Sequence, residues 1–296
     1  GLGYGRFDDF LCRPDWQDWR RQGLGSSGRL GCSSPHRRDR RSGALSQQAR
    51  RARSDSTDAS LAAAFTEAAK SFDSGLALVA VGGYGREELS PFSDVDVVLL
   101  HSDQLDAAEV DRVAEQLWRS LWDQQIPIDQ SVRSLSQIVT LAETDFRVAT
   151  GLLDARAVAG DAGLVIALRS TVLAHWRRDA KKQLAAIRRD REARLERSGW
   201  LAYEAVPDLK NSGGGLRDAV LLRAISATWL VDLPMDTVRE LTSELLDFRD
   251  DLQEAAGRRG DKLLPEYVRD SQADIRVRDI GRRIFHLVER AWHRLD

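Results

Sequence analysis

The chain has 296 residues, which is enough for one large domain or two ordinary ones with a substantial apolar core. Its 44 basic and 46 acidic residues give a net charge of −2, so the overall charge gives no reason to expect a nucleic-acid partner. No apolar run reaches the roughly 18 residues of a membrane span, and none is expected. No secretory leader is expected, and the two cysteines, Cys12 and Cys32, are too few for a disulfide framework or a zinc site. We therefore expect a cytoplasmic protein.

The amino-terminal residues differ in composition from the rest of the chain. Residues 1–53 hold 12 Arg and 5 Asp, a net charge of +7, together with five Leu but no Val or Ile. So few aliphatic side chains cannot repay the entropy lost on ordering the segment. Residues 1–55 are therefore predicted to be a disordered tail, or sequence that does not belong to the native domain. A basic arm for nucleic acid is the alternative.

Residues 56–145 show the pattern of a small sheet covered by helices. The Ala-rich residues 58–72 carry one apolar face and predict a helix. Apolar residues at helical spacing predict a second helix over 106–125. Strands are predicted over 76–82, 94–101 and 126–134. The order α-β-β-α-β predicts an α+β domain built on a small mixed sheet.

Residues 146–296 are predicted to form an all-helical domain. The one long interruption of the helical pattern, 197–215, contains Pro207 and three consecutive glycines, Gly213–Gly215. The expected helices from this region and the residues just before it are 135–143, 146–158, 162–196, 216–231, 234–258 and 272–294.

The most informative segment is VGGYGREELSPFSDVDVVLL at 81–100. Gly82 and Gly83 directly follow a predicted strand, where they allow positive φ angles and a close approach of backbone N–H groups to a phosphate. Asp94 and Asp96 open the next strand, and residues two apart in a strand share a face. Adjacent carboxylates repel unless a cation joins them, and oxygen ligands beside a phosphate favour Mg²⁺. Two such ions could hold a triphosphate and neutralise a leaving pyrophosphate.

This spacing resembles the nucleotidyltransferase superfamily with a polymerase-beta-like catalytic core, in preference to two solvated aspartates after a flexible loop. The resemblance implies a third carboxylate from a neighbouring strand, for which Asp129 is the candidate. A one-residue slip of that strand would turn Asp129 to the other face. Asp123, at the end of the preceding helix, is therefore kept as the fallback.

The same segment more narrowly resembles the PII uridylyltransferase family, bifunctional enzymes that modify the PII nitrogen-regulatory protein. SVRS at 131–134, LDAR at 153–156 and PDLKNSGGGLRD at 207–218 agree with the family in order and spacing. The similarity covers roughly 58–294. It implies that Asp94, Asp96 and Asp129 bind metal and act in catalysis. The residues implied to bind nucleotide are Gly82, Gly83, Arg86, Ser93, Lys210 and Arg217.

Some of these residues have an ordinary structural alternative, and some positions depart from the family. Arg86 could be a solvated loop residue, and the glycines beside Lys210 and Arg217 could be a hinge before a charged helix start. Glu87 stands where the family usually has Gly, which would place a negative charge in the phosphate loop, and Gln130 replaces a frequent His.

The chain contains no His-Asp pair. Family members, by contrast, continue into a metal-dependent phosphohydrolase domain with a His-Asp motif and then into glutamine-sensing domains. Those domains are therefore predicted to be absent, and the chain is expected to be an amino-terminal fragment or the product of a truncated gene. Without the sensing domains, any activity is expected to be insensitive to glutamine.

The resemblance implies transfer of UMP or AMP from UTP or ATP to a Tyr of a PII protein, with two Mg²⁺ ions and release of pyrophosphate. The identity of the nucleobase is left open, because the metal ions and the glycine turn would contact the phosphates of the nucleotide and not its base. Two alternatives remain. One is a truncated, non-catalytic module that binds nucleotide or PII. The other is an enzyme like glutamine synthetase adenylyltransferase, against which the Gly-Gly-Leu-Arg-Asp segment argues.

Overall fold

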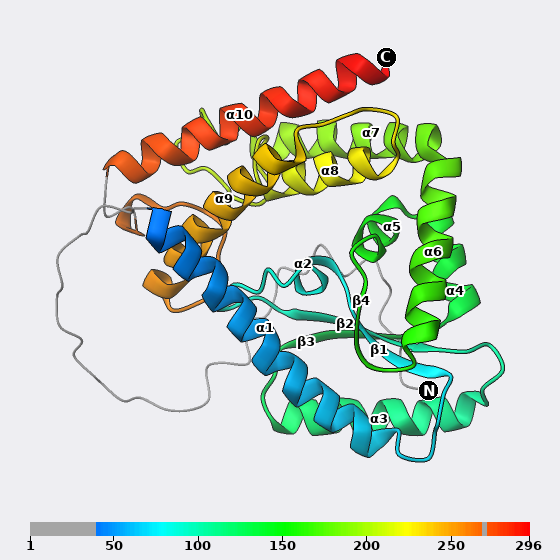
Figure 1. Cartoon of the computed structure of the whole chain (residues 1–296). Helices are drawn as coiled ribbons and strands as arrows, with labels where there is room; N and C mark the ends of the chain where they lie inside the picture. Colours follow the sequence, from blue (N-terminus) through cyan, green and yellow to red (C-terminus); the bar gives the residue numbers. More distant parts are fainter. Residues whose placement is uncertain (1–39, 268–270) are drawn as a thin grey trace, which may run out of the picture.

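The computed structural model describes residues 40–267 and 271–296 (Figure 1). The first half contains α1 (Arg40–Ala68), β1 (Leu76–Ala80), α2 (Gly82–Gly85), β2 (Val95–His101), α3 (Ala107–Asp123), β3 (Ile128–Ser134), α4 (Leu135–Thr144), α5 (Phe146–Leu152) and β4 (Arg156–Gly160). The second half contains α6 (Ala162–Arg178), α7 (Ala180–Ser198), α8 (Leu216–Ala227), α9 (Met235–Ala256), the short 3₁₀ helix η3 (Pro265–Tyr267) and α10 (Ser271–Leu295). The α+β class expected from the sequence is confirmed.

The sheet has four strands in the order β3-β2-β1-β4, and both of its faces are covered (Figure 1). β1 pairs antiparallel with β2 and with β4, whereas β2 and β3 are parallel. Alternate side chains of β1 and β2 enter two different cores. Leu78 and Leu99 pack with α1 and α3, while Val79 and Val98 join the larger core of the helical half. Burial on both faces explains why these strands are continuous apolar runs.

The first helix begins earlier than predicted. Helix α1 starts at Arg40 and includes residues 40–55, which the sequence assigned to a disordered tail. The cause is electrostatic rather than aliphatic: Arg50 is 2% exposed and its Nη1 lies 2.8 Å from both Asp247 Oδ1 and Asp250 Oδ2 of α9. The predicted end of the tail at 55 is therefore wrong. The rest of the predicted tail, with both cysteines, lies outside the described residues.

One predicted helix is in fact a helix followed by a strand. The helix predicted over 146–158 stops at Leu152, and β4 then completes the edge of the sheet against β1. Backbone pairing at that edge outweighs the helical propensity of Arg156–Gly160. A sharp turn with Gly160 at φ +85° follows β4, and the Asp161 side chain accepts from Leu164 N to cap α6. The predicted domain boundary at 145/146 therefore runs through the sheet.

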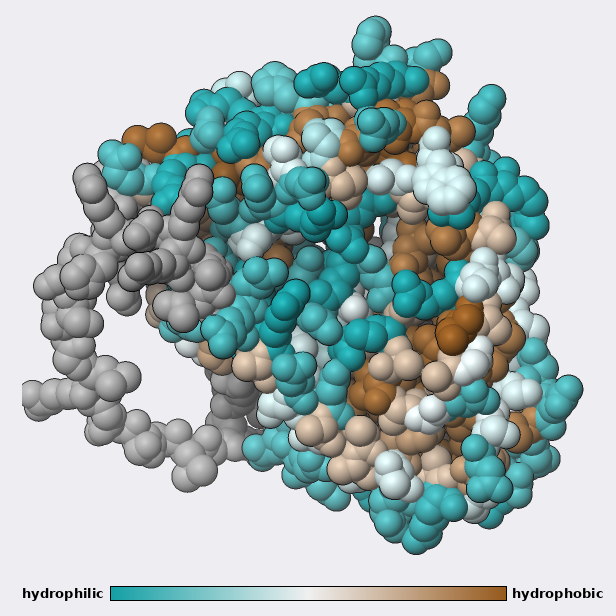
Figure 2. All heavy atoms as spheres, in the orientation of Figure 1, coloured by the Kyte–Doolittle hydropathy of each residue, from teal (hydrophilic) through white to brown (hydrophobic). Residues whose placement is uncertain are grey.

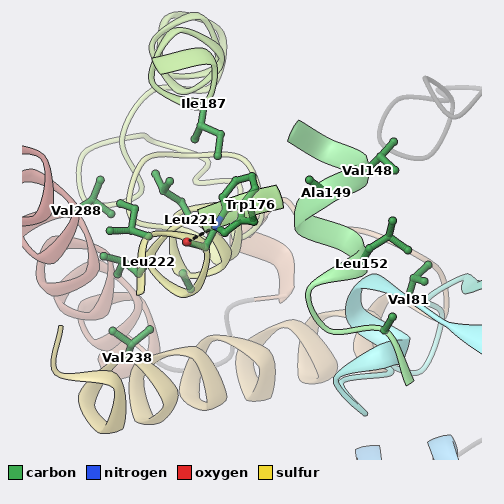
Figure 3. Packing of buried hydrophobic residues seen from close by; sticks show 14 of the residues in the cluster. Val81, Val148, Ala149, Leu152, Trp176, Ile187, Leu221, Leu222, Val238 and Val288 are labelled. Atoms are coloured by element: carbon green, nitrogen blue, oxygen red, sulfur yellow. Dashed lines mark hydrogen bonds between the residues drawn. The ribbon is translucent and has the colours of Figure 1, made fainter. Parts of the chain in front are cut away.

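The helical half packs around one large apolar core that continues onto the sheet. Trp176 is buried in it, and its Nε1 donates to the carbonyl of Ala224 over 2.9 Å (Figure 3). The single helix predicted over 162–196 is divided at Asp179 into α6 and α7. Among the described residues, no helix combines the length and the apolar character needed to cross a membrane.

Candidate active site

The turn after β1 brings the backbone next to a carboxylate. Gly82 begins the short helix α2 with φ +57°, a conformation that favours glycine. A Cβ built on Gly82 would lie 3.1 Å from Asp96 Oδ2. Glycine at this position therefore lets the carboxylate and the turn approach each other. The amide of Val81 donates to the Asp96 carbonyl over 3.1 Å and ties the turn to β2.

Asp96 and Asp129 are neighbours across the parallel pair of β2 and β3. They are register partners, so the strand carrying Asp129 has not slipped to the opposite face. Burial raises the pKa of Asp96 to about 7, with further contributions from the negative charges of Asp129 and Asp94. Lys210 and Arg259 oppose this rise. The three predicted carboxylates therefore act on one another, whereas the fallback Asp123 is exposed at the end of α3.

The donor chemistry of this site fits a hard divalent cation. Mutual repulsion and burial of the carboxylates are the conditions that a bound Mg²⁺ would relieve. Among the described residues, however, no three His, Cys, Asp or Glu side chains lie close enough together to hold an ion. Asp94 is instead engaged elsewhere, because its Oδ2 forms an ion pair with Arg259 Nη1. The predicted ligands are thus present, but one of them is bound to an arginine.

The raised pKa of Asp96 predicts that metal binding depends on pH. A metal must displace the proton from this carboxyl, so Mn²⁺ affinity should fall roughly tenfold per pH unit below pH 7 and level off above it. Electron paramagnetic resonance titration of Mn²⁺ across about pH 5.5 to 8.5 measures this slope. The Asp96→Asn variant is the control and should show a flatter profile. Equal affinity at both ends of the range in the wild-type chain would contradict the prediction.

A cavity of about 280 Å³ opens between the sheet and the helical half. In Figure 2, hydrophilic residues gather near the middle of the face and hydrophobic ones beside them. The predicted residues that line the cavity are Gly82, Gly83, Arg86, Ser93, Asp94, Asp96, Lys210 and Arg217. Its apolar wall comes from α5, α7 and α8, with Val148, Leu152, Ile187 and Leu221 (Figure 3). The cavity therefore has a charged part at the carboxylates and an apolar part beyond it.

Arg86 lines this cavity with its charge already balanced. Its Nε lies 2.6 Å from Glu88 Oε2, and its Nη1 lies 3.2 Å from Asp154 Oδ2. Burial acts to lower the pKa of Arg86, but the two carboxylates raise it more, so that it stays above its ordinary value. Arg223 also binds Asp154 over 2.6 Å. The structure thus places Arg86 in a buried ion network, which sequence reasoning did not foresee.

Lys210 is held beside the carboxylates by an ordered turn. Asp208 Oδ1 accepts from the backbone N–H of Lys210 over 2.9 Å and from that of Asn211 over 2.8 Å. Burial lowers the pKa of Lys210, and the positive charges of Arg249, Arg217 and Arg259 lower it further, against the influence of Asp261. Positive charge is therefore concentrated on this wall of the cavity.

Two cationic members of this wall, Arg249 and Arg259, were missed by sequence reasoning. Arg249 of α9 donates from Nη1 to Ser93 Oγ over 3.2 Å, and its Nε lies 2.6 Å from Asp261 Oδ1. Ser93, predicted as a nucleotide ligand, is therefore already in contact with Arg249. Neither arginine belongs to a motif, so only the fold brings them to the site.

The glycine run that follows Lys210 is fixed rather than hinged. Asp218, in the first turn of α8, is fully buried and accepts from Arg194 Nη2 over 2.6 Å and from the Gly214 N–H over 2.9 Å. Gly214 has φ +84°, and a Cβ there would lie 2.1 Å from the Gly281 carbonyl oxygen. The Gly-Gly-Leu-Arg-Asp segment thus locks α8 against α7 and α10 and sets the position of Lys210.

Glu87 does not line the cavity that Asp94 and Asp96 line. It has φ +61°, and its half-exposed side chain turns towards α1, where Oε2 lies 3.8 Å from Arg51 Nε. It lines a second cavity of about 370 Å³ on that side of the turn. The expected negative charge in the phosphate loop is therefore absent from this conformation, and the positive φ explains why glycine suits the position.

Glycine at position 87 should relieve backbone strain. A left-handed conformation costs a residue with a Cβ about 1 kcal/mol, whereas the exposed contact with Arg51 contributes little. We expect Glu87→Gly to be more stable than Glu87→Ala by about 1 kcal/mol in urea unfolding. The alanine variant removes the same carboxylate but keeps the strain. Equal stability of the two variants would show that residue 87 is not strained.

Comparison with known proteins shows which proteins this chain is similar to. Residues 63–145 match the model of the nucleotidyltransferase domain. The chain is 48% identical to the bifunctional uridylyltransferase/uridylyl-removing enzyme of Streptomyces coelicolor over 214 residues, which cover 72% of this chain and 25% of that protein. It is 40% identical to the Mycobacterium tuberculosis enzyme of the same name over 209 residues, covering 68% and 26%. The chain thus spans about a quarter of the length of these curated relatives.

Among solved structures, a chain described as "Crystal structure of the toxin-antitoxin with AMP-PNP" matches at 18% identity and a TM-score of 0.27, covering 41% of this chain and 90% of that one. A superposition this poor carries no information about the site.

Proposed function

We propose that this chain, a member of the bifunctional uridylyltransferase/uridylyl-removing enzyme family through its nucleotidyltransferase portion, transfers a nucleoside monophosphate from UTP or ATP to a Tyr hydroxyl of a PII protein. The observation that supports this most strongly is the register pairing of Asp96 with Asp129, where Asp96 lies beside Gly82 and lines the same cavity as Lys210. Pyrophosphate is the second product. The reaction belongs in the cytoplasm, where nucleoside triphosphates are available.

The charged part of the cavity is suited to a triphosphate. Asp94, Asp96 and Asp129 would hold Mg²⁺, which supplies charge neutralisation and activation of the attacking oxygen when bound. Lys210 and Arg217 line the same cavity as Asp94 and Asp96. The turn at Gly82 allows backbone N–H groups to approach phosphate oxygens. These groups would position the α-phosphate and stabilise the charge that develops on the leaving pyrophosphate.

Asp129 is the residue we assign nearest the attacking oxygen. It extends the carboxylate pair on the neighbouring strand, and its negative charge helps raise the pKa of Asp96 to about 7. In this arrangement either carboxylate could accept the proton of the Tyr hydroxyl as the new P–O bond forms. The pyrophosphate leaves as the old P–O bond breaks, and Lys210, which lines the same cavity, would balance its charge.

The apolar part of the cavity would receive the nucleobase. Phe146, Leu216 and Val220 line this part of the cavity and are partly exposed, so they offer apolar surface of the kind that base-binding pockets commonly use. Thr150 and Asp190 are polar groups on the same lining. Because uracil and adenine differ in their donors and acceptors, this part of the cavity would decide between UTP and ATP, whereas the carboxylates would not.

Mass spectrometry of a PII protein tests the proposal and names the base. The complete chain is incubated with PII and Mg²⁺, and with UTP or ATP in separate reactions. A mass increase of one UMP or one AMP on a single Tyr is expected with one of the two nucleotides. Omitting Mg²⁺ should abolish it. An unmodified PII protein with both nucleotides would overturn the proposed transfer.

A non-catalytic module is the second candidate, and the ion pair between Asp94 and Arg259 favours it, because the carboxylates do not form a metal cluster as they stand. Such a module would bind triphosphate or PII without turnover. The two candidates separate in the same reactions, since a module would retain its nucleotide unchanged while PII stays unmodified.

A further inference from the structure

We propose that Arg259 is an exchangeable positioning residue, which holds Asp94 in the nucleotide-free chain and moves to the triphosphate when metal and nucleotide enter. The inference rests on the proposed function, because it assigns a further residue to the same site. It makes the release of Asp94 and the binding of phosphate two consequences of one side-chain movement.

The contact itself suits exchange. Arg259 Nη1 and Asp94 Oδ2 form an ion pair, with the Arg259 side chain 53% exposed and the Asp94 side chain 37% exposed. An ion pair with this much exposure contributes little net stability, since water competes for both groups. The pair can therefore open without disturbing the core. By contrast, Arg249 nearby is buried against Asp261 and two serines and is fixed.

The loop that carries Arg259 has open space beside its glycines and is anchored directly after Arg259, where the Gly260 carbonyl accepts from Gln253 Nε2 over 3.3 Å. Gly257 and Gly260 lie on either side, and a Cβ built on either would meet nothing within 4 Å. Beyond them, the Asp261 carbonyl accepts from Leu209 N over 2.7 Å, and Lys262 pairs with Asp208 as an isolated bridge. The anchor keeps the loop next to the segment of Lys210, while the open space beside its glycines leaves room for movement.

The destination of the guanidinium is set by the charges around it. Arg259 lines the cavity together with Lys210, Arg217 and Arg249, and their charges lower the pKa of Lys210. This concentration of positive charge is unfavourable in the nucleotide-free chain and complements a triphosphate. A planar guanidinium also matches phosphate oxygens, to which it can donate two parallel hydrogen bonds.

Movement of Arg259 would complete the carboxylate set. Asp94 precedes β2 and lies two residues before Asp96, which is paired with Asp129. In the present conformation Asp94 is bound to Arg259, and the described residues contain no group of three carboxylates close enough to hold an ion. Once the arginine binds phosphate instead, Asp94 is free to turn to the face that Asp96 and Asp129 share. Metal binding and triphosphate binding are thereby coupled.

The test measures metal and nucleotide binding separately in the complete chain. Mn²⁺ binding without nucleotide is followed by electron paramagnetic resonance, and binding of a non-hydrolysable UTP or ATP analogue by calorimetry in Mg²⁺. Arg259→Ala should bind Mn²⁺ about threefold more tightly, because an exposed ion pair no longer competes for Asp94. It should bind the analogue about tenfold or more weakly, because a charge-assisted contact to phosphate is lost.

Arg258→Ala is the matched control. Arg258 is the adjacent residue, is exposed, and forms no ion pair or hydrogen bond with other residues in the described part of the chain. Its replacement changes the net charge by the same amount and should leave both affinities near the wild-type values. Arg259→Lys, as a second variant, should keep part of the analogue affinity through its charge. Thermal unfolding of each variant verifies that it is folded.

Effects of opposite sign on Mn²⁺ and on the analogue are the signature of exchange. Changes in the same direction, no change in either affinity, or equal effects in the Arg258 control would overturn the inference. Failure of the wild-type chain to bind the analogue would overturn it as well. If the opposite shifts are found but PII is not modified, the proposed transfer fails while the role of Arg259 stands.

Discussion

Asp96→Asn should lower the rate of nucleotidyl transfer by about a thousandfold or more, since it removes the central carboxylate of the site. The variant should remain folded and should unfold at the same or a higher temperature than the wild-type chain. This follows because burial and the charges of Asp129 and Asp94 disfavour the ionised form of Asp96 and raise its pKa to about 7. An asparagine has the shape of the protonated acid and carries no charge to repel. Initial rates and melting curves of the same preparation measure both effects.

Asp123→Asn serves as the control for that variant. Asp123 was the alternative third carboxylate, and it lies exposed at the end of α3. Its replacement should leave the rate within about twofold of the wild type, because a solvated surface charge has little influence on the site. Asp129→Asn should lower the rate as Asp96→Asn does. A large loss from Asp123→Asn with none from Asp129→Asn would refute the assignment of the carboxylates.

Asp218→Asn should destabilise the fold by about 3 to 5 kcal/mol, the usual cost of removing one partner from a buried ion network. The Asp218 carboxylate is fully buried and accepts from Arg191, Arg194 and the Gly214 backbone. Without its charge, two nearly buried guanidinium groups lose their principal counter-ion. Urea unfolding followed by tryptophan fluorescence measures the change.

A solvent-exposed ion pair provides the comparison for Asp218. Asp236→Asn removes the partner of Arg239 at the surface of α9, where the Asp236 side chain is 88% exposed. The expected cost is below about 1 kcal/mol. If the two variants lose equal stability, the network around Asp218 does not fix the glycine segment. Because that segment carries Lys210, Asp218→Asn should also weaken triphosphate binding under conditions where the variant is still folded.

The sequence was most informative where a motif lies on a strand or helix whose apolar residues recur at regular spacing. The glycine pair, the strand and Asp94-Val95-Asp96 lie next to each other in the chain, so local geometry was enough to predict that they meet. Asp129 could also be predicted, because the parallel register of β2 and β3 keeps the alternation of faces. The helical spacing likewise predicted α3 and α8–α10 to within a few residues.

The sequence was least informative where a charge takes the place of an apolar side chain. The residues around Arg50 form no clear apolar face that would reveal that α1 extends back to Arg40, because the burial of Arg50 depends on two aspartates about 200 positions away. Arg249 and Arg259 reach the site through tertiary packing alone, and no spacing rule links them to Asp94. β4 was missed for a related reason: Arg156–Gly160 form a strand because they pair with the edge of β1, and this pairing cannot be seen in the local sequence.

The central claim is that this constellation performs nucleotidyl transfer, and the fate of the phosphates tests it most directly. The complete chain is incubated with PII, Mg²⁺ and a triphosphate labelled on either its α- or its γ-phosphate. We predict that the α-label stays on PII while the γ-label leaves with pyrophosphate, and that Asp96→Asn abolishes both events. A γ-label on PII, or α-labelling that persists in Asp96→Asn, would contradict the account.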